Sequence, residues 1–142
     1  MATVDLAGLL RCLEVTETTP GSWTAPNLPM DYHRIFGGQL LAQTIMVATA
    51  TAEGRTIRSL GCLFPREGSL AKPFSYEIEL SHTGRTFATR RISAQQDGRP
   101  FFLAQASLHV PEGGPEHQEP APDVGDPADA EPEEMTMIPW ET

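Results

Sequence analysis

The segment that most constrains the fold runs from Gly37 to about Ala52, because neither glycine nor proline interrupts it after Gly38. Its apolar side chains are spread around most of the helical circumference, with small alanines and threonines between them. These apolar residues are Leu40, Leu41, Ile45, Met46 and Val47. The pattern predicts one long helix that ends at Gly54 and is buried on most sides.

The chain after this helix predicts an antiparallel sheet. Residues 74–82 alternate strictly between apolar and polar side chains, as in a strand with one buried face. Thr83-Gly84 and Asp97-Gly98 are turn signals, and an Asp-Gly pair between two strand patterns favours a hairpin. Strands of this length have to curve, and the apolar helix is the object around which they would curve. Four strands are expected, over residues 57–64, 74–82, 85–96 and 99–110.

The residues before the long helix predict two smaller elements. A short helix is expected over residues 5–13, where Asp5 can cap the first turn and leucines recur at roughly helical spacing. The threonine-rich stretch from Glu14 to Trp23 predicts one strand, at an edge of the sheet. A proline-rich loop then leads to the long helix.

Charge divides the chain into two parts. Residues 1–111 carry nine acidic and ten basic side chains, whereas residues 112–142 carry ten acidic side chains and no lysine or arginine. The second part also holds six prolines and few apolar residues, so it cannot bury enough surface to fold alone. We therefore expect a folded domain over residues 1–111 and a disordered acidic tail over residues 112–142. The alternative is that the tail docks on a partner through Met135, Met137, Ile138 and Trp140.

Composition narrows the class of protein. A length of 142 residues suits one domain, and the nearly neutral first part argues against nucleic acid as a partner. No stretch has the length and apolarity of a membrane span, so a soluble, cytoplasmic protein is expected. Cys12 and Cys62 predict ordinary buried thiols, and no spacing of cysteine and histidine predicts a metal site.

Four short runs occur in one order along the chain. They are Arg34-Ile35-Phe36-Gly37-Gly38-Gln39, Gly84-Arg85-Thr86-Phe87-Ala88-Thr89-Arg90-Arg91, Gly98-Arg99-Pro100-Phe101-Phe102 and Glu112-Gly113-Gly114-Pro115-Glu116-His117-Gln118. In order and spacing they resemble the N-terminal half of the acyl-CoA thioesterase II family. The resemblance covers residues from about 30 to 120.

The resemblance implies an α+β protein with a hot-dog fold, in which a curved antiparallel sheet wraps a long central helix. Members of the family are double hot-dogs, and their catalytic Asp, Thr and Gln lie in the C-terminal unit. We expect a single hot-dog here, with the second unit on another chain or in a longer protein of which this sequence is a piece. The family carries two histidines in one strand, but this chain has Arg58-Ser59-Leu60-Gly61 there, so no role is carried over for them.

Thioester hydrolysis requires a group that activates water and donors for the developing oxyanion. The backbone N–H groups of Gly38 and Gln39, at the predicted helix start, are the candidate donors. Gly37 would let a carbonyl oxygen or a phosphate approach the backbone. The alternative is that both glycines only allow close packing of the helix on the sheet.

The water-activating carboxylate is harder to find, because the long helix contains no acidic residue. Asp31 lies before the helix and is the candidate catalytic base, with loop capping or solvent exposure as the alternative. Glu53 sits at the far end of the helix. Glu77 and Glu79 fall on the polar side of the alternating strand and are expected in solvent.

Three further residues are candidates for substrate binding. Gln43 lies one helical turn from Gln39 and can contact acyl-CoA or orient a water, although an internal hydrogen bond is an equal alternative. His33 adjoins the loop before the helix, where a surface position is the alternative. Arg90 represents the arginines of the last two strands, which can bind CoA phosphates or pair with a strand glutamate.

The leading hypothesis is a thioesterase subunit of lipid metabolism that hydrolyses fatty acyl-CoA, or helps a partner subunit to hydrolyse it. Such a subunit would work as a homo-oligomer or with a second hot-dog unit, without metal or cofactor, since CoA is part of the substrate. No membrane partner is expected. The alternative is a non-catalytic hot-dog subunit that binds acyl-CoA or has a structural role. A hot-dog enoyl-CoA hydratase ranks last, because the short Asp- and His-bearing segment that it requires is not found.

Overall fold

The computed structural model describes residues 5–131. Its helices and strands follow the order expected from the sequence, with one additional strand near the N-terminus. They are α1 (Leu6–Cys12), β1 (Thr16–Thr19), β2 (Ser22–Thr24), α2 (Gly37–Ala50), β3 (Thr56–Leu63), β4 (Ser75–Thr83), β5 (Phe87–Gln96), β6 (Arg99–His109) and the 3-10 helix η1 (Pro127–Asp129).

Helix α1 begins as the sequence predicts. The carboxylate of Asp5 accepts a hydrogen bond of 2.7 Å from the N–H of Gly8, which satisfies one free donor of the first turn. Gly8 and Cys12 form the buried side of the helix. Its leucines are exposed: Leu6, Leu9 and Leu10.

The single strand predicted from Glu14 to Trp23 is wrong, because the chain reverses inside it. Strands β1 and β2 pair with each other, so that Thr16 lies opposite Thr24. The reversal places Gly21 at φ +82°, a conformation that side chains other than glycine rarely adopt. Strand β1 is at the edge of the sheet, as expected for this stretch.

The sheet has six antiparallel strands in the order β1-β2-β4-β5-β6-β3. The predicted Asp-Gly hairpin between β5 and β6 is confirmed, since Asp97 (φ 51°) and Gly98 (φ 70°) both adopt the left-handed conformation of a two-residue turn. Within residues 5–131, β3 pairs only with β6 and so forms the second edge of the sheet.

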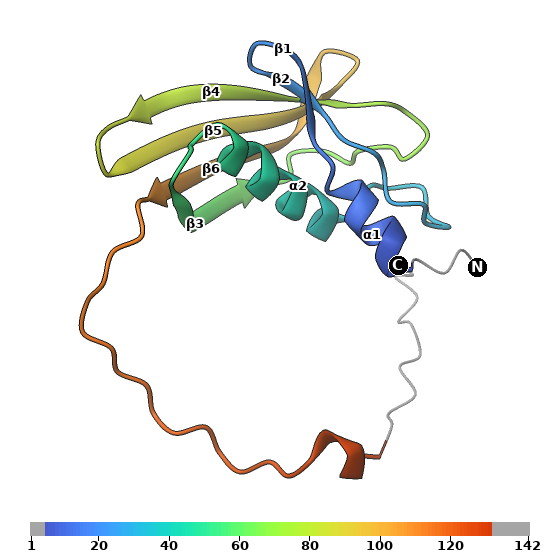
Figure 1. The fold of residues 1–142 in the computed structure, drawn as a ribbon. Helices are drawn as coiled ribbons and strands as arrows, with labels where there is room; N and C mark the ends of the chain where they lie inside the picture. Colours follow the sequence, from blue (N-terminus) through green and yellow to red (C-terminus); the bar gives the residue numbers. More distant parts are fainter. Residues whose placement is uncertain (1–4, 132–142) are drawn as a thin grey trace. The chain divides into compact units, whose positions relative to one another are not determined.

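Helix α2 lies along one face of this sheet (Figure 1) and contacts β3, β4, β5 and β6. Its buried side includes Leu40, Val47 and Ala48. The sheet presents small side chains to it, which lets the helix approach closely. These are Ala88, Ala94, Ala104 and Ala106.

The prediction of one long helix is confirmed, but the prediction that it is buried on most sides is wrong. Ile45 and Met46 are each 41% exposed, on the side of α2 that the sheet does not cover. A single layer of strands covers one side of a helix, and the apolar residues on its other side remain in contact with water. None of the helices in the described part of the chain is long and apolar enough to cross a membrane.

The chain divides into two units, residues 1–112 and 113–142. In the described part of the second unit, residues 113–131 are exposed and η1 is the one regular element. The side chain of Asp126 caps η1 by accepting a 2.8 Å bond from the N–H of Ala128. The candidate docking residues Met135, Met137, Ile138 and Trp140 lie outside the described residues.

Candidate functional site

The N-terminus of α2 carries the predicted oxyanion donors. Phe36, the residue before the helix, has an extended backbone, and no side chain caps the first turn. The N–H of Gln39 donates to the carbonyl of Phe36 at 3.1 Å, so this predicted donor is already used. Among residues 5–131, no acceptor is found for the N–H groups of Gly37 and Gly38. A carbonyl oxygen placed there would meet two backbone donors and the positive end of the helix dipole.

The same glycines also make room for two aromatic rings. A Cβ atom at Gly38 would lie 2.5 Å from the ring of Phe36, and one at Gly37 would lie 3.4 Å from the ring of Phe64. Phe36 is 54% exposed and Phe64 is 51% exposed. The close approach at Gly38 is therefore to an exposed ring, and within residues 5–131 the N–H groups of Gly37 and Gly38 have no acceptor.

The side chain of Gln39 joins α2 to the loop that precedes it. Its Oε1 accepts a 2.9 Å bond from the N–H of Leu28, and its Nε2 donates to Oδ1 of Asn27 at 3.0 Å. The side chain is 3% exposed. Both ends of the amide are therefore engaged in holding the chain together.

Gln43 lies one turn further along α2 and is fully buried. Its Nε2 donates to the carbonyls of Cys12 at 2.6 Å and Pro26 at 2.8 Å. Its Oε1 accepts a 2.8 Å bond from the hydroxyl of Tyr76. These contacts match the internal hydrogen-bonding alternative for Gln43, and they leave its predicted contact with substrate without support.

Tyr76 is the residue of this network that sequence reasoning missed. Its place in the alternating pattern of β4 predicts a buried side chain but not a partner for the hydroxyl. Burial, and then the neighbouring thiol of Cys12, raise the pKa of Tyr76 far above its usual range. The hydroxyl is therefore a permanent hydrogen-bond donor to Gln43 at any physiological pH.

Asp31 and His33 lie in the exposed segment before α2. Nε2 of His33 accepts a bond of 2.9 Å from Nε of Arg34, and its ring lies 4.6 Å from that of Tyr32. No hydrogen bond or ion pair involving Asp31 is found among the described residues. Within the described residues, neither side chain forms a hydrogen bond or an ion pair with the helix start.

Arg90 lies at the opposite end of α2 from Gly38. It is 1% exposed. Its Nε donates to the hydroxyl of Thr51, the C-cap residue of α2, at 3.0 Å, and its Nη2 donates to the carbonyl of the same residue at 2.8 Å. Its Nη1 donates to the carbonyl of His82 at 2.7 Å. Burial, and then the charge of Arg55, lower the pKa of Arg90. These contacts leave the predicted contact with CoA phosphates without support, because the guanidinium is buried and bonded to the helix end and the sheet.

The two strand glutamates lie on the face of the sheet away from α2, as the alternating pattern predicts. Oε1 of Glu77 accepts a 2.8 Å bond from the hydroxyl of Ser22, and Glu79 pairs with Arg91 at 3.4 Å. Cross-strand pairing, the alternative considered for the strand arginines, is thus found for Arg91.

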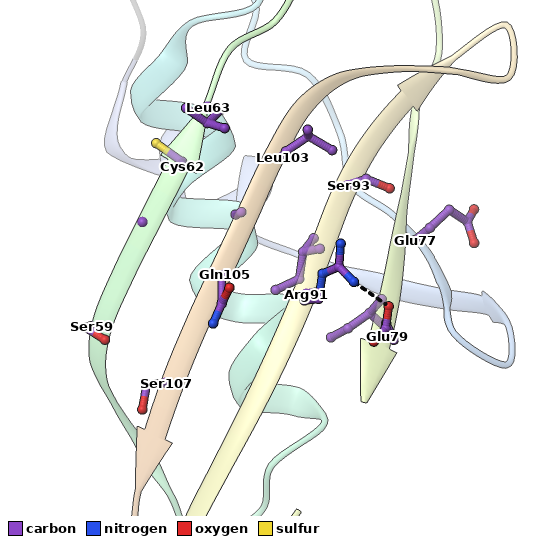
Figure 2. Close-up of a pocket in the computed structure, with 14 residues that line it drawn as sticks. Ser59, Cys62, Leu63, Glu77, Glu79, Arg91, Ser93, Leu103, Gln105 and Ser107 are labelled. Atoms are coloured by element: carbon purple, nitrogen blue, oxygen red, sulfur yellow. Dashed lines mark hydrogen bonds and ion pairs between the residues drawn. The ribbon is translucent and has the colours of Figure 1, made fainter. Parts of the chain in front are cut away.

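A hollow of about 820 Å³ lies on this outer face. Figure 2 shows side chains from four strands around it, with the pair of Arg91 and Glu79 on one side and Leu63 and Leu103 on another. Small side chains such as Ser59 leave the middle open. The hollow is separated from the start of α2 by the sheet itself, so it does not belong to the predicted thioester site.

The buried polar side chains of residues 5–131 carry amides, two hydroxyls, one guanidinium and one imidazole. They are Gln39, Gln43, Thr44, Tyr76, Arg90 and His109. No carboxylate is among the buried side chains of residues 5–131. Within the same residues, no group of three or more His, Cys, Asp or Glu side chains is arranged to hold a metal ion.

A family model of the acyl-CoA thioesterase N-terminal domain matches residues 24–109. Acyl-coenzyme A thioesterase 8 of Mus musculus is 33% identical over 134 residues, which cover 88% of this chain and 42% of the mouse protein. Acyl-CoA thioesterase 2 of Haemophilus influenzae is 30% identical over 125 residues, covering 87% of this chain and 44% of that protein.

A solved structure agrees with these sequence relatives. The tesB protein of Mycobacterium avium subs paratuberculosis superposes with a TM-score of 0.80 at 30% identity, covering 87% of this chain and 49% of that one. This chain thus spans less than half the length of these relatives. The helix, the curved sheet and the matched residues together identify a single hot-dog unit of the acyl-CoA thioesterase family, to which this chain belongs.

Proposed function

We propose that this chain forms one of the two hot-dog units of an acyl-CoA thioesterase, whose hydrolytic site is completed by a second unit. The second unit lies further along a longer protein or on a separate chain. The observation that carries the proposal is the uncapped start of α2, bordered by Phe36 and Phe64, in a chain of the thioesterase family. These features suit a thioester carbonyl beside an apolar acyl chain.

The surface available to a second unit includes β3 and the exposed side of α2. Strand β3 has backbone donors and acceptors on its free edge, since it pairs only with β6. Ile45 and Met46 of α2 are exposed, as is Phe64 just after the end of β3. A second hot-dog unit that joined its sheet to β3 would cover these apolar side chains and form the acyl channel between the two helices.

In the assembled site, the thioester carbonyl oxygen accepts hydrogen bonds from the open N–H groups of Gly37 and Gly38 at the helix start. Attack by water places negative charge on that oxygen, and the fixed donors stabilise it. The intermediate then expels the CoA thiolate and leaves a carboxylic acid. The Asp, Thr and Gln that position the water are those which the family resemblance assigns to the C-terminal unit. CoA is part of the substrate, and no cofactor takes part.

The other candidate residues take different places in this proposal. Gln39 and Gln43 hold the loop before α2 and so position the helix start. Gly37 supports the close approach of substrate, and His33 remains a candidate contact at the loop. Asp31 acts as the base only if two copies of this chain form an active pair without a different unit.

The decisive measurement compares acyl-CoA hydrolysis by the purified chain alone and after joining to a second hot-dog unit of the same family. We expect nearly no turnover by the chain alone and robust turnover by the assembly, because the water-activating groups come from the second unit. Robust turnover by a homodimer would contradict the shared site and would direct attention to Asp31.

A non-catalytic subunit is the second candidate. The buried polar side chains favour it, because within residues 5–131 they include amides but no carboxylate. Calorimetric binding of acyl-CoA, with no hydrolysis even in the presence of the second unit, would select this candidate.

A further inference from the structure

A groove of about 390 Å³ lies where β5 turns into β6, and we refer to it as the hairpin groove. The loop from residue 65 to 73 forms one wall, and the hairpin forms the other. Three basic side chains line it: Arg66, Lys72 and Arg99.

Gln96 joins the two walls of the hairpin groove by hydrogen bonds. Its Nε2 donates to the carbonyls of Ser69 at 2.7 Å and Lys72 at 3.0 Å, and its Oε1 accepts a 2.9 Å bond from the N–H of Ser69. Gly68 packs so closely on Phe101 that a Cβ would lie 2.4 Å from its ring. The groove is therefore built before any ligand arrives, which lowers the entropy lost on binding.

The hairpin groove retains positive charge after its internal ion pairs are counted. Its two carboxylates already have cationic partners, since Glu67 pairs with Arg34 at 3.0 Å and Asp97 pairs with Lys72.

Two cations of the groove remain without a carboxylate. Among residues 5–131, no carboxylate lies within 4.0 Å of the guanidinium of Arg66 or Arg99. Nη1 of Arg66 donates to the carbonyl of Pro100 at 2.6 Å, which holds this side chain beside the first residues of β6. Two guanidinium groups thus remain available for an anion in one groove.

The hairpin groove is also connected to the start of α2. The N–H of Ile35 donates to the carbonyl of Gly68 at 2.8 Å, and the N–H of Leu70 donates to the carbonyl of His33 at 3.1 Å. The wall of the groove therefore pairs with the segment that leads into the helix. A ligand with its reactive group at Gly38 and an anionic end on a long arm can occupy both places.

We propose that the hairpin groove binds the phosphate groups of the nucleotide end of CoA, with Arg66 and Arg99 as their direct partners. This inference rests on the proposed function, because it takes acyl-CoA as the ligand. A guanidinium donates two parallel N–H bonds to phosphate oxygens, and two such groups in one groove provide partners for both phosphates of a diphosphate. In this arrangement the thioester lies toward the start of α2, and the phosphates lie in the hairpin groove.

The test is calorimetric titration of the full chain, alone and joined to a second hot-dog unit, with CoA, adenosine 3′,5′-bisphosphate and pantetheine. In Arg66→Gln/Arg99→Gln we expect CoA and the bisphosphate to bind about tenfold more weakly at low ionic strength, because both lose charge-assisted bonds. Pantetheine lacks phosphates, so its binding is expected to stay unchanged. Arg66→Lys keeps the positive charge but cannot donate two parallel N–H bonds, so we expect this variant to lose part of the affinity for CoA.

Arg85→Gln is the matched control. Arg85 is an exposed arginine in the turn between β4 and β5, at the other end of β5 from the groove. We expect this variant to bind CoA as the wild type does. Equal losses in Arg85→Gln and the double variant would overturn the proposal by showing a general charge effect. Unchanged CoA affinity in the double variant, or no binding of CoA by the wild type in either form, would also overturn it.

Experiments can contradict CoA binding in the hairpin groove and acyl-CoA hydrolysis independently of each other. Arginine-dependent CoA binding by an assembly that hydrolyses no acyl-CoA would support the groove and contradict the proposed activity. Hydrolysis with a KM that is the same in the wild type and in the double variant would support the activity and overturn the groove. Equal affinities for CoA and inorganic pyrophosphate would overturn the assignment to the coenzyme.

Discussion

The amide of Gln43 is bonded at both ends in a fully buried position, and its partners come from three distant parts of the chain. Leaving such groups unpaired in the interior costs about 1–3 kcal/mol each, so the network strongly favours one arrangement of α1, the preceding loop and β4 around α2. Gln39 adds two bonds to the same loop. These glutamines therefore act on the candidate site through the position of the helix start.

At Gly38, we expect a substitution to change catalysis much more than stability. In Gly38→Ala the new methyl group displaces the exposed ring of Phe36 and crowds the open N–H, while alanine favours the helix. We expect the free energy of unfolding to change by less than about 1 kcal/mol. Alanine keeps the backbone N–H, but its methyl group displaces the thioester carbonyl from that donor. Acyl-CoA turnover by the complete assembly should therefore fall about a hundredfold, as for a misplacement of about 1 Å.

Urea unfolding and steady-state hydrolysis measure the two effects of this change. Gly113→Ala is the control for the glycine-to-alanine change, because a Cβ there would meet no heavy atom of residues 5–131 within 4 Å and the residue lies outside the helix start. Full activity in Gly38→Ala would show that the glycine serves only the packing of the Phe36 ring.

At the scale of single elements, the two ends of α2 differ in their hydrogen-bond partners. The N-terminal end is left open, whereas Arg90 closes the C-terminal end by donating to Thr51. The same side chain donates to the carbonyl of His82, where the register of β4 against β5 shifts. One cation thus stabilises both the negative end of the helix dipole and an irregular part of the sheet.

Replacement of Arg90 tests this role. In Arg90→Leu the carbonyls of Thr51 and His82 lose their donor in the interior, so we expect a loss of about 2–4 kcal/mol in the free energy of unfolding. Urea unfolding of the chain measures it. Arg91→Leu is the matched control, since Arg91 is on the same strand with a side chain 67% exposed, and it should change stability by less than about 1 kcal/mol. A loss of CoA affinity in Arg90→Leu, with stability retained, would instead restore the substrate role suggested by the sequence.

Local patterns predict most of these elements correctly. The alternation in β4, the Asp97-Gly98 turn and the breaker-free run of α2 depend only on residues close together in sequence. The β1–β2 reversal was missed, because a glycine inside a threonine-rich stretch does not show whether the chain bends or continues.

At the scale of the whole molecule, two surfaces of this hot-dog unit differ in character. The exposed side of α2, next to the free edge of β3, presents Ile45 and Met46. The outer face of the sheet combines the ion pair of Arg91 and Glu79 and small side chains with the apolar Leu63 and Leu103 (Figure 2). The first surface joins the apolar side of α2 to the free backbone groups of β3, so we expect association to occur there.

A charge on the exposed side of α2 tests that expectation. Ile45→Lys should leave the chain folded, because the side chain is 41% exposed, but should weaken association with a second hot-dog unit or a second copy more than about tenfold. Circular dichroism checks the fold, and light scattering after size-exclusion chromatography measures the assembly. Leu103→Lys is the matched control, because Leu103 is 37% exposed on the outer face of the sheet. Loss of assembly in Leu103→Lys with retention in Ile45→Lys would assign association to the other face.

The sequence by itself determined the single long helix, the strands from β3 to β6 and the acid-free composition of α2, because periodicity and turn residues act within a few positions of one another. Only the tertiary structure decided which side chains meet. It joins Gln43 to Tyr76, encloses Arg90 at the end of α2, and brings Arg66 beside the start of β6. The physical reason is that a buried polar group requires a partner, and the partner comes from whichever distant segment the packing of the helix on the sheet brings near.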